Sequence, residues 1–224
     1  TLVAFPLYIS MLYRPIRMLA DKFNTLQMGL IAAERVYKLL DNTDTVQNTG
    51  TLAPERLHGK VEFKDVYFSY SGEHEQDPIL QGVSFNIQPG ETLAIVGSTG
   101  SGKTTIISLL SRFYEIQKGQ IRIDDHDQRE YEVFALRRRI AVVLQDVFLF
   151  SGTVLENITL RDASISEEQV VEAAKMIGAH RFIEKLPGGY HYQVRERGAT
   201  LSMGQRQLIS FVRALVFNPD ILIL

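Results

Sequence analysis

The chain has 224 residues, of which 45% are hydrophobic and 22% are charged, enough for one globular core with an appendage. Its formal net charge of −2 predicts no basic surface for nucleic acid, and we expect the basic run 137–139 to be a solvated helix face. The absence of cysteine excludes disulfides, cysteine-ligated zinc and thiol catalysis in this chain, and its histidines show no metal-ligand spacing.

The N-terminal segment is apolar at first and then amphipathic. Residues 1–13 carry no charge, but they are fewer than the roughly 20 residues that span a bilayer. From 14 to 40, apolar side chains recur at three- and four-residue steps, which predicts one long helix. Together they predict the end of a transmembrane helix that enters the cytoplasm, with Arg14 and Arg17 near the membrane surface. The alternative is an N-terminal helix of a soluble domain.

The next segment is rich in Asn, Thr, Asp, Gly and Pro and has no periodicity. Residues 41–60 are therefore predicted to form a linker. Residues 61–70 and 83–87 then alternate apolar and polar side chains and are enriched in aromatic and β-branched types. This pattern predicts half-buried antiparallel strands.

A phosphate-binding motif occupies residues 97–104, whose sequence GSTGSGKT satisfies G-x-x-x-x-G-K-[ST]. We expect the apolar run 93–96 before it to be a buried parallel strand, and the spacing in 103–112 predicts a helix. The loop would then surround phosphates with backbone N–H groups at a helix N-terminus. Lys103 is expected to reach the β- and γ-phosphates, and the Thr104 hydroxyl to ligate Mg²⁺. The alternative is a loop that only caps a helix.

The C-terminal half alternates between short strands and helices. The predicted elements are a strand at 120–123, a helix around 131–137, a β-rich run at 140–144, mainly helix over 153–185, a helix from 204 to 217 and a strand at 221–224. Ser166 is placed like the start of a helix. Because the last run is apolar, we expect it to be a buried strand within a longer protein.

Three further features narrow the class. Residues 201–207 (LSMGQRQ) resemble the LSGGQ signature of ATP-binding cassette (ABC) proteins and precede an amphipathic helix. Gln145, after a predicted strand, matches the Q-loop of that family, and Tyr70 matches its aromatic A-loop residue. Their order and spacing around the phosphate loop resemble the ATPase domain of ABC exporters, and the likeness covers essentially the whole chain.

The resemblance implies an α/β fold, a P-loop NTPase core of ABC type with an antiparallel β-subdomain and a helical subdomain. A long N-terminal helix from a membrane domain would precede it. Residues 1–40 would be the end of the transmembrane domain, 41–60 the linker, and 61–224 a nucleotide-binding domain truncated before the Walker B Asp and the catalytic Glu. The segments 150–158 and 196–198 would face coupling helices. The 224 residues alone are then expected to bind ATP without hydrolysing it.

The resemblance also implies a site for ATP and Mg²⁺. Lys103 and Gln145 would be the catalytic residues, and Thr104 and Gln145 would ligate the metal ion. The signature would bind ATP held by a partner domain. The residues implied to contact nucleotide are Tyr70, Gly97, Ser98, Thr99, Gly100, Ser101, Gly102, Lys103, Thr104, Thr105, Ser202, Gly204 and Gln205. Simpler alternatives are a strand-end aromatic at Tyr70, a plain loop residue at Gln145 and a helix cap at Ser202.

The implied function is that of an ABC exporter, in which ATP-driven dimerisation and hydrolysis move a substrate across the cell membrane. The ATPase domain would lie on the cytoplasmic side. Its partners would be a second nucleotide-binding domain, in a homodimer or a heterodimer, and the transmembrane domains, with no nucleic acid. One alternative is a degenerate regulatory half of a heterodimeric exporter, because Met203 replaces the first glycine of the signature. A soluble ABC ATPase of DNA repair or translation is disfavoured by the apolar N-terminal segment.

Overall fold

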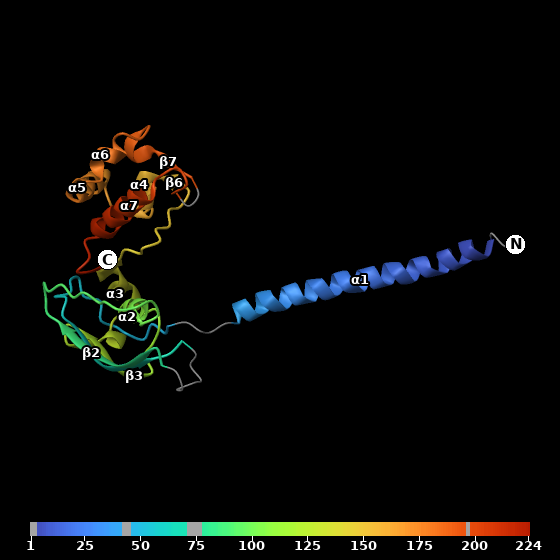
Figure 1. Cartoon of the computed structure of the whole chain (residues 1–224), viewed down its shortest axis with the longest axis horizontal. Coiled ribbons are helices and arrows are strands. Elements are labelled where there is room, and N and C mark those ends of the chain that lie inside the picture. The colour runs from blue at the N-terminus through green and yellow to red at the C-terminus, as the bar shows by residue number, and fades with distance from the viewer. Residues whose placement is uncertain (1–3, 42–45, 71–77, 196–197) are drawn as a thin grey trace. The chain divides into compact units, whose positions relative to one another are not determined.

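The computed structural model describes residues 4–41, 46–70, 78–195 and 198–224 (Figure 1). The chain divides into two compact units, Thr1–Thr45 and Val46–Leu224. The predicted segment 196–198 lies partly outside the described residues, which resume at Gly198.

The first unit is one helix, α1 (Ala4–Leu40), which contains Pro15. The amphipathic helix predicted over 14–40 is therefore confirmed, and it also includes most of the apolar segment before it. Within this unit, large apolar side chains are exposed along its length, including Leu19, Phe23 and Leu40. Among the described residues, no helix combines the length and the hydropathy needed to cross a bilayer.

A four-stranded antiparallel sheet begins the second unit, in the order β2-β1-β3-β4. Its strands are β1 (Val61–Phe68), β2 (Leu80–Ile87), β3 (Lys118–Ile123) and β4 (His126–Asp127). β1 pairs with β2 on one side and with β3 on the other, which confirms the predicted antiparallel strands. Alternate side chains such as Phe63 and Ile121 are buried in one core with Leu109 of helix α2 (Lys103–Leu110).

A shorter parallel pair follows the sheet along the chain. The 3₁₀ turn η1 (Gln128–Glu130) and helix α3 (Val133–Arg139) lead into β5 (Ile140–Val142), which pairs in parallel with β8 (Ile221–Ile223). The predicted helix and both strands are confirmed. The predicted burial of β8 is wrong, because Leu222 is half exposed and Ile221 and Ile223 are only partly buried.

The strand predicted at 93–96 is wrong. Residues 91–98 have no regular secondary structure in the described chain, and Val96 is 88% exposed. An extended segment becomes a strand only where a neighbouring strand accepts and donates its backbone hydrogen bonds. Among the described residues, β5 and β8 pair only with each other, and the apolar run before the phosphate loop is exposed without a neighbouring strand.

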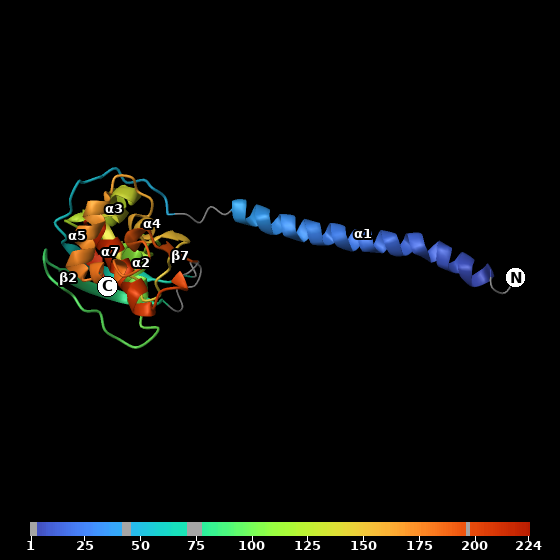
Figure 2. The ribbon, with the colours of Figure 1, turned by 90° about the horizontal axis from the view of Figure 1, so that it is seen from above.

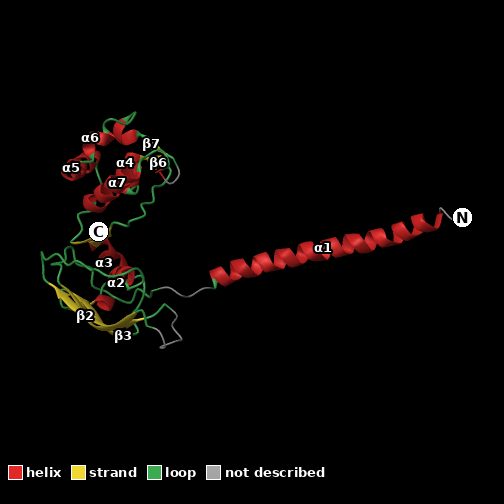
Figure 3. Cartoon of the chain, in the orientation of Figure 1, coloured by secondary structure: helices red, strands yellow, loops and turns green. Residues whose placement is uncertain are grey.

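Helices dominate the region from residue 153 onward, as predicted (Figures 2 and 3). They are α4 (Val154–Thr159), α5 (Glu167–Ile177), α6 (His180–Ile183) and α7 (Met203–Val216), with the turn η2 (Gly189–His191) and a small pair of strands, β6 (Gly152–Thr153) and β7 (Gln193–Val194). Ser166 caps α5 in a reciprocal pair of hydrogen bonds with Gln169. The apolar faces of these helices form a second core around Ile158, Val170 and Ile209.

The segment 46–60, within the predicted linker, belongs to the second unit and is hydrogen-bonded to the rest of it. The Leu57 N–H donates to the buried Asp220 carboxylate at 2.9 Å, and the Lys60 N–H donates to Asp124 at 3.0 Å. Arg112 donates to the Gln47 carbonyl at 3.2 Å. The division between the units therefore falls at 45–46, before these contacts.

Candidate functional site

The phosphate motif forms a loop that ends at the N-terminus of α2. Gly102 precedes the helix with a φ of 88°, and no side chain caps the helix there. A Cβ at this position would also lie 2.7 Å from Leu80 Cδ2, so both the backbone conformation and the space favour glycine. The first N–H groups of α2 are thus left without a side-chain acceptor, which is the arrangement that binds anionic oxygens.

Lys103 lies across this loop. Its Nζ donates to the carbonyls of Gly97 and Ser98, each at 2.8 Å. The ammonium group is therefore held beside the uncapped helix start, where two sources of positive charge coincide. Thr104, the next residue, is exposed, so its hydroxyl is accessible to a ligand.

Tyr70 lies two residues after the end of β1 and contacts the same helix. Its hydroxyl is 3.3 Å from the buried Thr105 hydroxyl in the first turn of α2, and its side chain is 50% exposed. The ring makes perpendicular contacts with Phe68 and with Tyr114, each with centroids 4.9 Å apart. The structure thus brings together Tyr70, Thr105 and the phosphate loop, as the sequence predicted for one site.

The signature residues lie at the start of α7. The Gln205 N–H donates to Ser202 Oγ at 3.3 Å, and the Ser202 N–H donates to Gln205 Oε1 at 2.9 Å. This capping box satisfies two backbone donors of the helix. Gly204 faces open space, and Met203 is 55% exposed. The predicted helix-cap role of Ser202 is therefore real, and the hydroxyl retains the capacity to donate to a ligand.

Gln145 is exposed on the segment that follows β5. With Asp146 and Phe148 it lines a hollow of about 190 Å³ that Met203 and Arg206 line from α7. The structure therefore brings Gln145 to the signature region, while its predicted place beside Thr104 stays a prediction.

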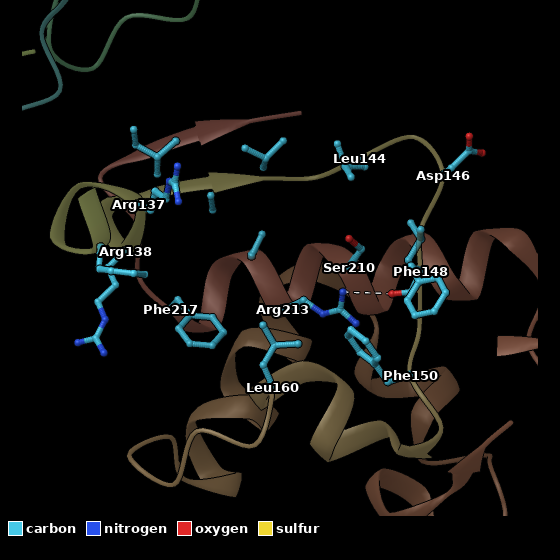
Figure 4. Close-up of a pocket in the computed structure, with 16 residues that line it drawn as sticks. Arg137, Arg138, Leu144, Asp146, Phe148, Phe150, Leu160, Ser210, Arg213 and Phe217 are labelled. Carbon is cyan, nitrogen blue, oxygen red and sulfur yellow. Dashed lines mark hydrogen bonds between the residues drawn. The ribbon is translucent and has the colours of Figure 1, made fainter. Parts of the chain in front are cut away.

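A larger hollow of about 610 Å³ was not predicted from the sequence (Figure 4). Aromatic and aliphatic side chains from α3, the segment after β5 and α7 line it, and residues 97–104 do not contribute. Arg213 of α7 donates through Nε to the Asn157 carbonyl at 2.8 Å and through Nη1 to the Phe148 carbonyl at 3.3 Å, and burial lowers the pKa of its guanidinium. The aromatic residues at 148 and 150 are a signal in the sequence, but only the fold brings Phe217 to the same hollow.

The residues at the start of α2 fit a triphosphate. An added Cβ would lie 2.6 Å from Ser101 Oγ at Gly97 and 2.7 Å from Leu80 Cδ2 at Gly102, so glycine lets the backbone pass close to these side chains, and no side chain caps the N-terminus of α2. For a metal ion, no group of three or more histidine or acidic side chains exists among the described residues. A bound Mg²⁺ would therefore need oxygen ligands from the nucleotide as well as from Thr104.

Residues 80–224 match the family model of the ABC transporter. The chain therefore belongs to the ABC transporter family, and the predicted family and fold class are confirmed. Gly102, Lys103 and the LSMGQRQ segment lie within the matched region.

Curated relatives agree with this assignment over nearly the full chain. The uncharacterized ABC transporter ATP-binding protein YknV of Bacillus subtilis (strain 168) is 44% identical over 99% of this chain and 36% of its own length. The ATP-dependent lipid A-core flippase of Syntrophus aciditrophicus (strain SB) is 40% identical over 100% of this chain and 37% of its own. The chain thus spans about a third of the length of the curated relatives it matches.

A solved structure supports the same fold. The structure of a bacterial Atm1-family ABC exporter with ATP bound matches with a TM-score of 0.75 and 38% identity, covering 96% of this chain and 38% of the other. The predicted function class, an exporter-type ABC ATP-binding domain, is thereby confirmed at the level of the family.

Proposed function

We propose that this chain binds and hydrolyses ATP as part of an ABC exporter, and that the ATP cycle drives a substrate across a membrane. The observation that carries the proposal is the start of α2, where an uncapped helix N-terminus and the Lys103 ammonium group meet at one loop. Both features favour a polyanion, and the ABC transporter match agrees with ATP as its identity.

Residues 97–105 would hold the triphosphate. The backbone N–H groups of the loop donate to its oxygens, and Lys103 Nζ leaves the Gly97 and Ser98 carbonyls for the β- and γ-phosphates. Tyr70 offers one face of its ring to adenine. Mg²⁺, when bound between the phosphates, Thr104 and Gln145, would neutralise part of the phosphate charge. Because phosphoryl transfer needs little covalent help, Lys103 and Gln145 act by positioning and by charge.

The signature segment would act on a second copy or a related domain. Ser202 Oγ already accepts from the Gln205 N–H, and its own proton is free to be donated to a phosphate oxygen of the partner's ATP. Gly204 leaves space for close approach to the helix start, and Gln205 keeps Ser202 in place. ATP then joins two nucleotide-binding domains, in a homodimer or a heterodimer.

The N-terminal unit would connect this ATPase to the membrane. We assign residues 1–40 to the end of a transmembrane domain and 61–224 to a nucleotide-binding domain on the cytoplasmic side, with 41–60 between them. Support comes from a relative described as a probable multidrug resistance ABC transporter ATP-binding/permease protein, YheH of Bacillus subtilis (strain 168), which is 44% identical over 100% of this chain. A helix with exposed apolar side chains is consistent with that position.

A second candidate is a regulatory half of a heterodimeric exporter that binds ATP with little turnover. Met203 favours it, because this bulky side chain is exposed at the start of α7, where a partner's phosphates would approach. Phosphate release at this single site, measured in the assembled transporter with the partner site inactivated, separates the two. Turnover abolished by Lys103→Ala supports the exporter ATPase, and tight ATP binding with no turnover supports the regulatory half.

The isolated 224 residues provide a further test of the assigned groups. We expect them to bind MgATP and to release no phosphate at a physiological rate. Phosphate release that matches the intact protein and is lost in Lys103→Ala would show that all catalytic groups lie within these residues.

A further inference from the structure

The Tyr70 ring is exposed and lies at the end of a strand, so its orientation depends on its neighbours. Half of the side chain is accessible, and the chain leaves β1 at Phe68, two residues before it. A ring that is to receive a base must keep its face in one place, because reordering it on binding costs affinity. Phe68, which is buried in the core, supplies one fixed contact at 4.9 Å and an interplanar angle of 86°.

Tyr114 supplies the second contact. Its ring lies 4.9 Å from that of Tyr70 at 81°, and 5.7 Å from that of Phe68 at 56°. Tyr70 therefore contacts both neighbouring rings in the near-perpendicular geometry that aromatic side chains favour, while Phe68 and Tyr114 meet at a tilted angle. Tyr114 is 44% exposed, and its ring contacts Tyr70 and Phe68.

Hydrogen bonds of Arg112 and Phe113 anchor the chain immediately before Tyr114. Arg112 is 1% exposed and donates through Nε to Glu115 at 2.9 Å and through Nη1 to the Tyr131 carbonyl at 3.0 Å. The Phe113 N–H donates to the Ser108 carbonyl of α2 at 2.9 Å. Tyr114 thus stands at a fixed position beyond the C-terminal end of the same helix that carries Lys103 at its start.

We infer that Tyr114 is a positioning residue for nucleotide binding, which holds the Tyr70 ring at the correct distance from the phosphate loop to receive the base. The inference rests on the proposed function, since it requires Tyr70 to contact the base. Tyr114 acts through Tyr70 and does not contact the nucleotide. It sets how much the base adds to the affinity that the phosphates provide.

The experiment uses two probes on the intact protein by calorimetry: a non-hydrolysable ATP analogue and inorganic tripolyphosphate, each with Mg²⁺. Because edge-to-face aromatic pairs have modest strength, and because Tyr114 acts only through Tyr70, Tyr114→Ala is expected to weaken binding of the analogue by about two- to fivefold. The affinity for tripolyphosphate, which has no base, should change less than about twofold, since Lys103 and the loop remain intact. Tyr114→Phe keeps the ring and should restore the analogue affinity.

Phe113→Ala is the matched control, because Phe113 is adjacent and similarly exposed but contacts the Arg137 guanidinium 4.9 Å from its ring centre. It should leave both affinities unchanged. The double variant Tyr70→Ala with Tyr114→Ala should bind the analogue no more weakly than Tyr70→Ala alone, because the two residues act as one unit.

Three results would overturn the inference while leaving the proposed function intact: an unchanged analogue affinity in Tyr114→Ala, an equal loss for both probes, or additive losses in the double variant. Failure of the unaltered protein to bind either probe would instead contradict the proposed function itself.

Discussion

Two helices of the second unit begin in opposite ways. At the start of α2, Gly102 provides no side-chain cap, and the Lys103 ammonium group is held by the carbonyls of Gly97 and Ser98. At the start of α7, Ser202 and Gln205 complete a capping box within the helix itself. At an uncapped helix start, the backbone N–H groups are free to donate to an anion. At a capped start two of these donors are already bonded, so a ligand can bind mainly through the remaining hydroxyl proton. The difference suggests a primary phosphate site at α2 and an auxiliary one at α7.

The largest expected effect comes from removing the charge at α2. Lys103→Ala should cost about 2–3 kcal/mol of ATP affinity, because the ammonium group would make charge-assisted hydrogen bonds to the phosphates. Calorimetric titration of MgATP into the intact protein measures it. An affinity equal to that of the unaltered protein would exclude residues 97–104 as the phosphate site.

The second test alters the shape of the same helix start. Gly102→Ala should destabilise the loop by about 1–2 kcal/mol, since a residue with a Cβ is strained in the left-handed region. The new Cβ would also press on Leu80 Cδ2, 2.7 Å away. Thermal unfolding and ATP titration should both respond. Gly204→Ala, at a position with open space, is the matched control and should change unfolding much less.

The third test removes the cap of α7. Ser202→Ala should cost about 1 kcal/mol of stability, the usual value of a lost N-cap. In a protein that binds but cannot hydrolyse ATP, it should weaken ATP-dependent association much more than ATP binding. Ser166→Ala removes the corresponding cap of α5, which is outside the signature, and controls for stability alone.

The fourth test concerns the base. Tyr70→Ala should lose about 1 kcal/mol of ATP affinity through the lost stacking surface, and Tyr70→Phe should restore it. Equal weakening by both substitutions would mean that the hydroxyl contact with Thr105 matters and the ring face does not.

The smallest effect is expected at Met203. Because its side chain is largely exposed, Met203→Gly should change stability by no more than about 0.5 kcal/mol and leave ATP-dependent association nearly unchanged. A marked gain in association would show that the methionine obstructs the partner's nucleotide, in favour of the regulatory alternative.

Features that depend on contacts between residues close in the sequence were predicted correctly from local sequence patterns. The phosphate loop, the cap at Ser166 and the strands around Phe63 depend on residues close in sequence or on simple alternation, and the structure has all of them. The strand predicted at 93–96 does not form, because a strand also needs a neighbouring strand to pair with, and no local pattern predicts that partner.

Contacts between residues far apart in the sequence could not be predicted, for the same reason. The composition of residues 41–60 predicts a linker, yet residues 46–60 form hydrogen bonds with Asp220 and Arg112, which are far away in the sequence. The contact between Tyr70 and Tyr114 likewise exists only in the folded chain. In the candidate site, the residues that would contact nucleotide could be predicted from the sequence, but the neighbouring residues that hold them in place could not.

The contrast between α2 and α7 is tested most directly by measuring ATP binding and ATP-dependent association together in two variants of the intact, hydrolysis-blocked protein. Lys103→Ala should lose both binding and association. Ser202→Ala should keep ATP affinity within about twofold while association falls, because its ligand is held by the partner. Equal losses of ATP affinity in the two variants would contradict the account, since both helix starts would then serve the same nucleotide.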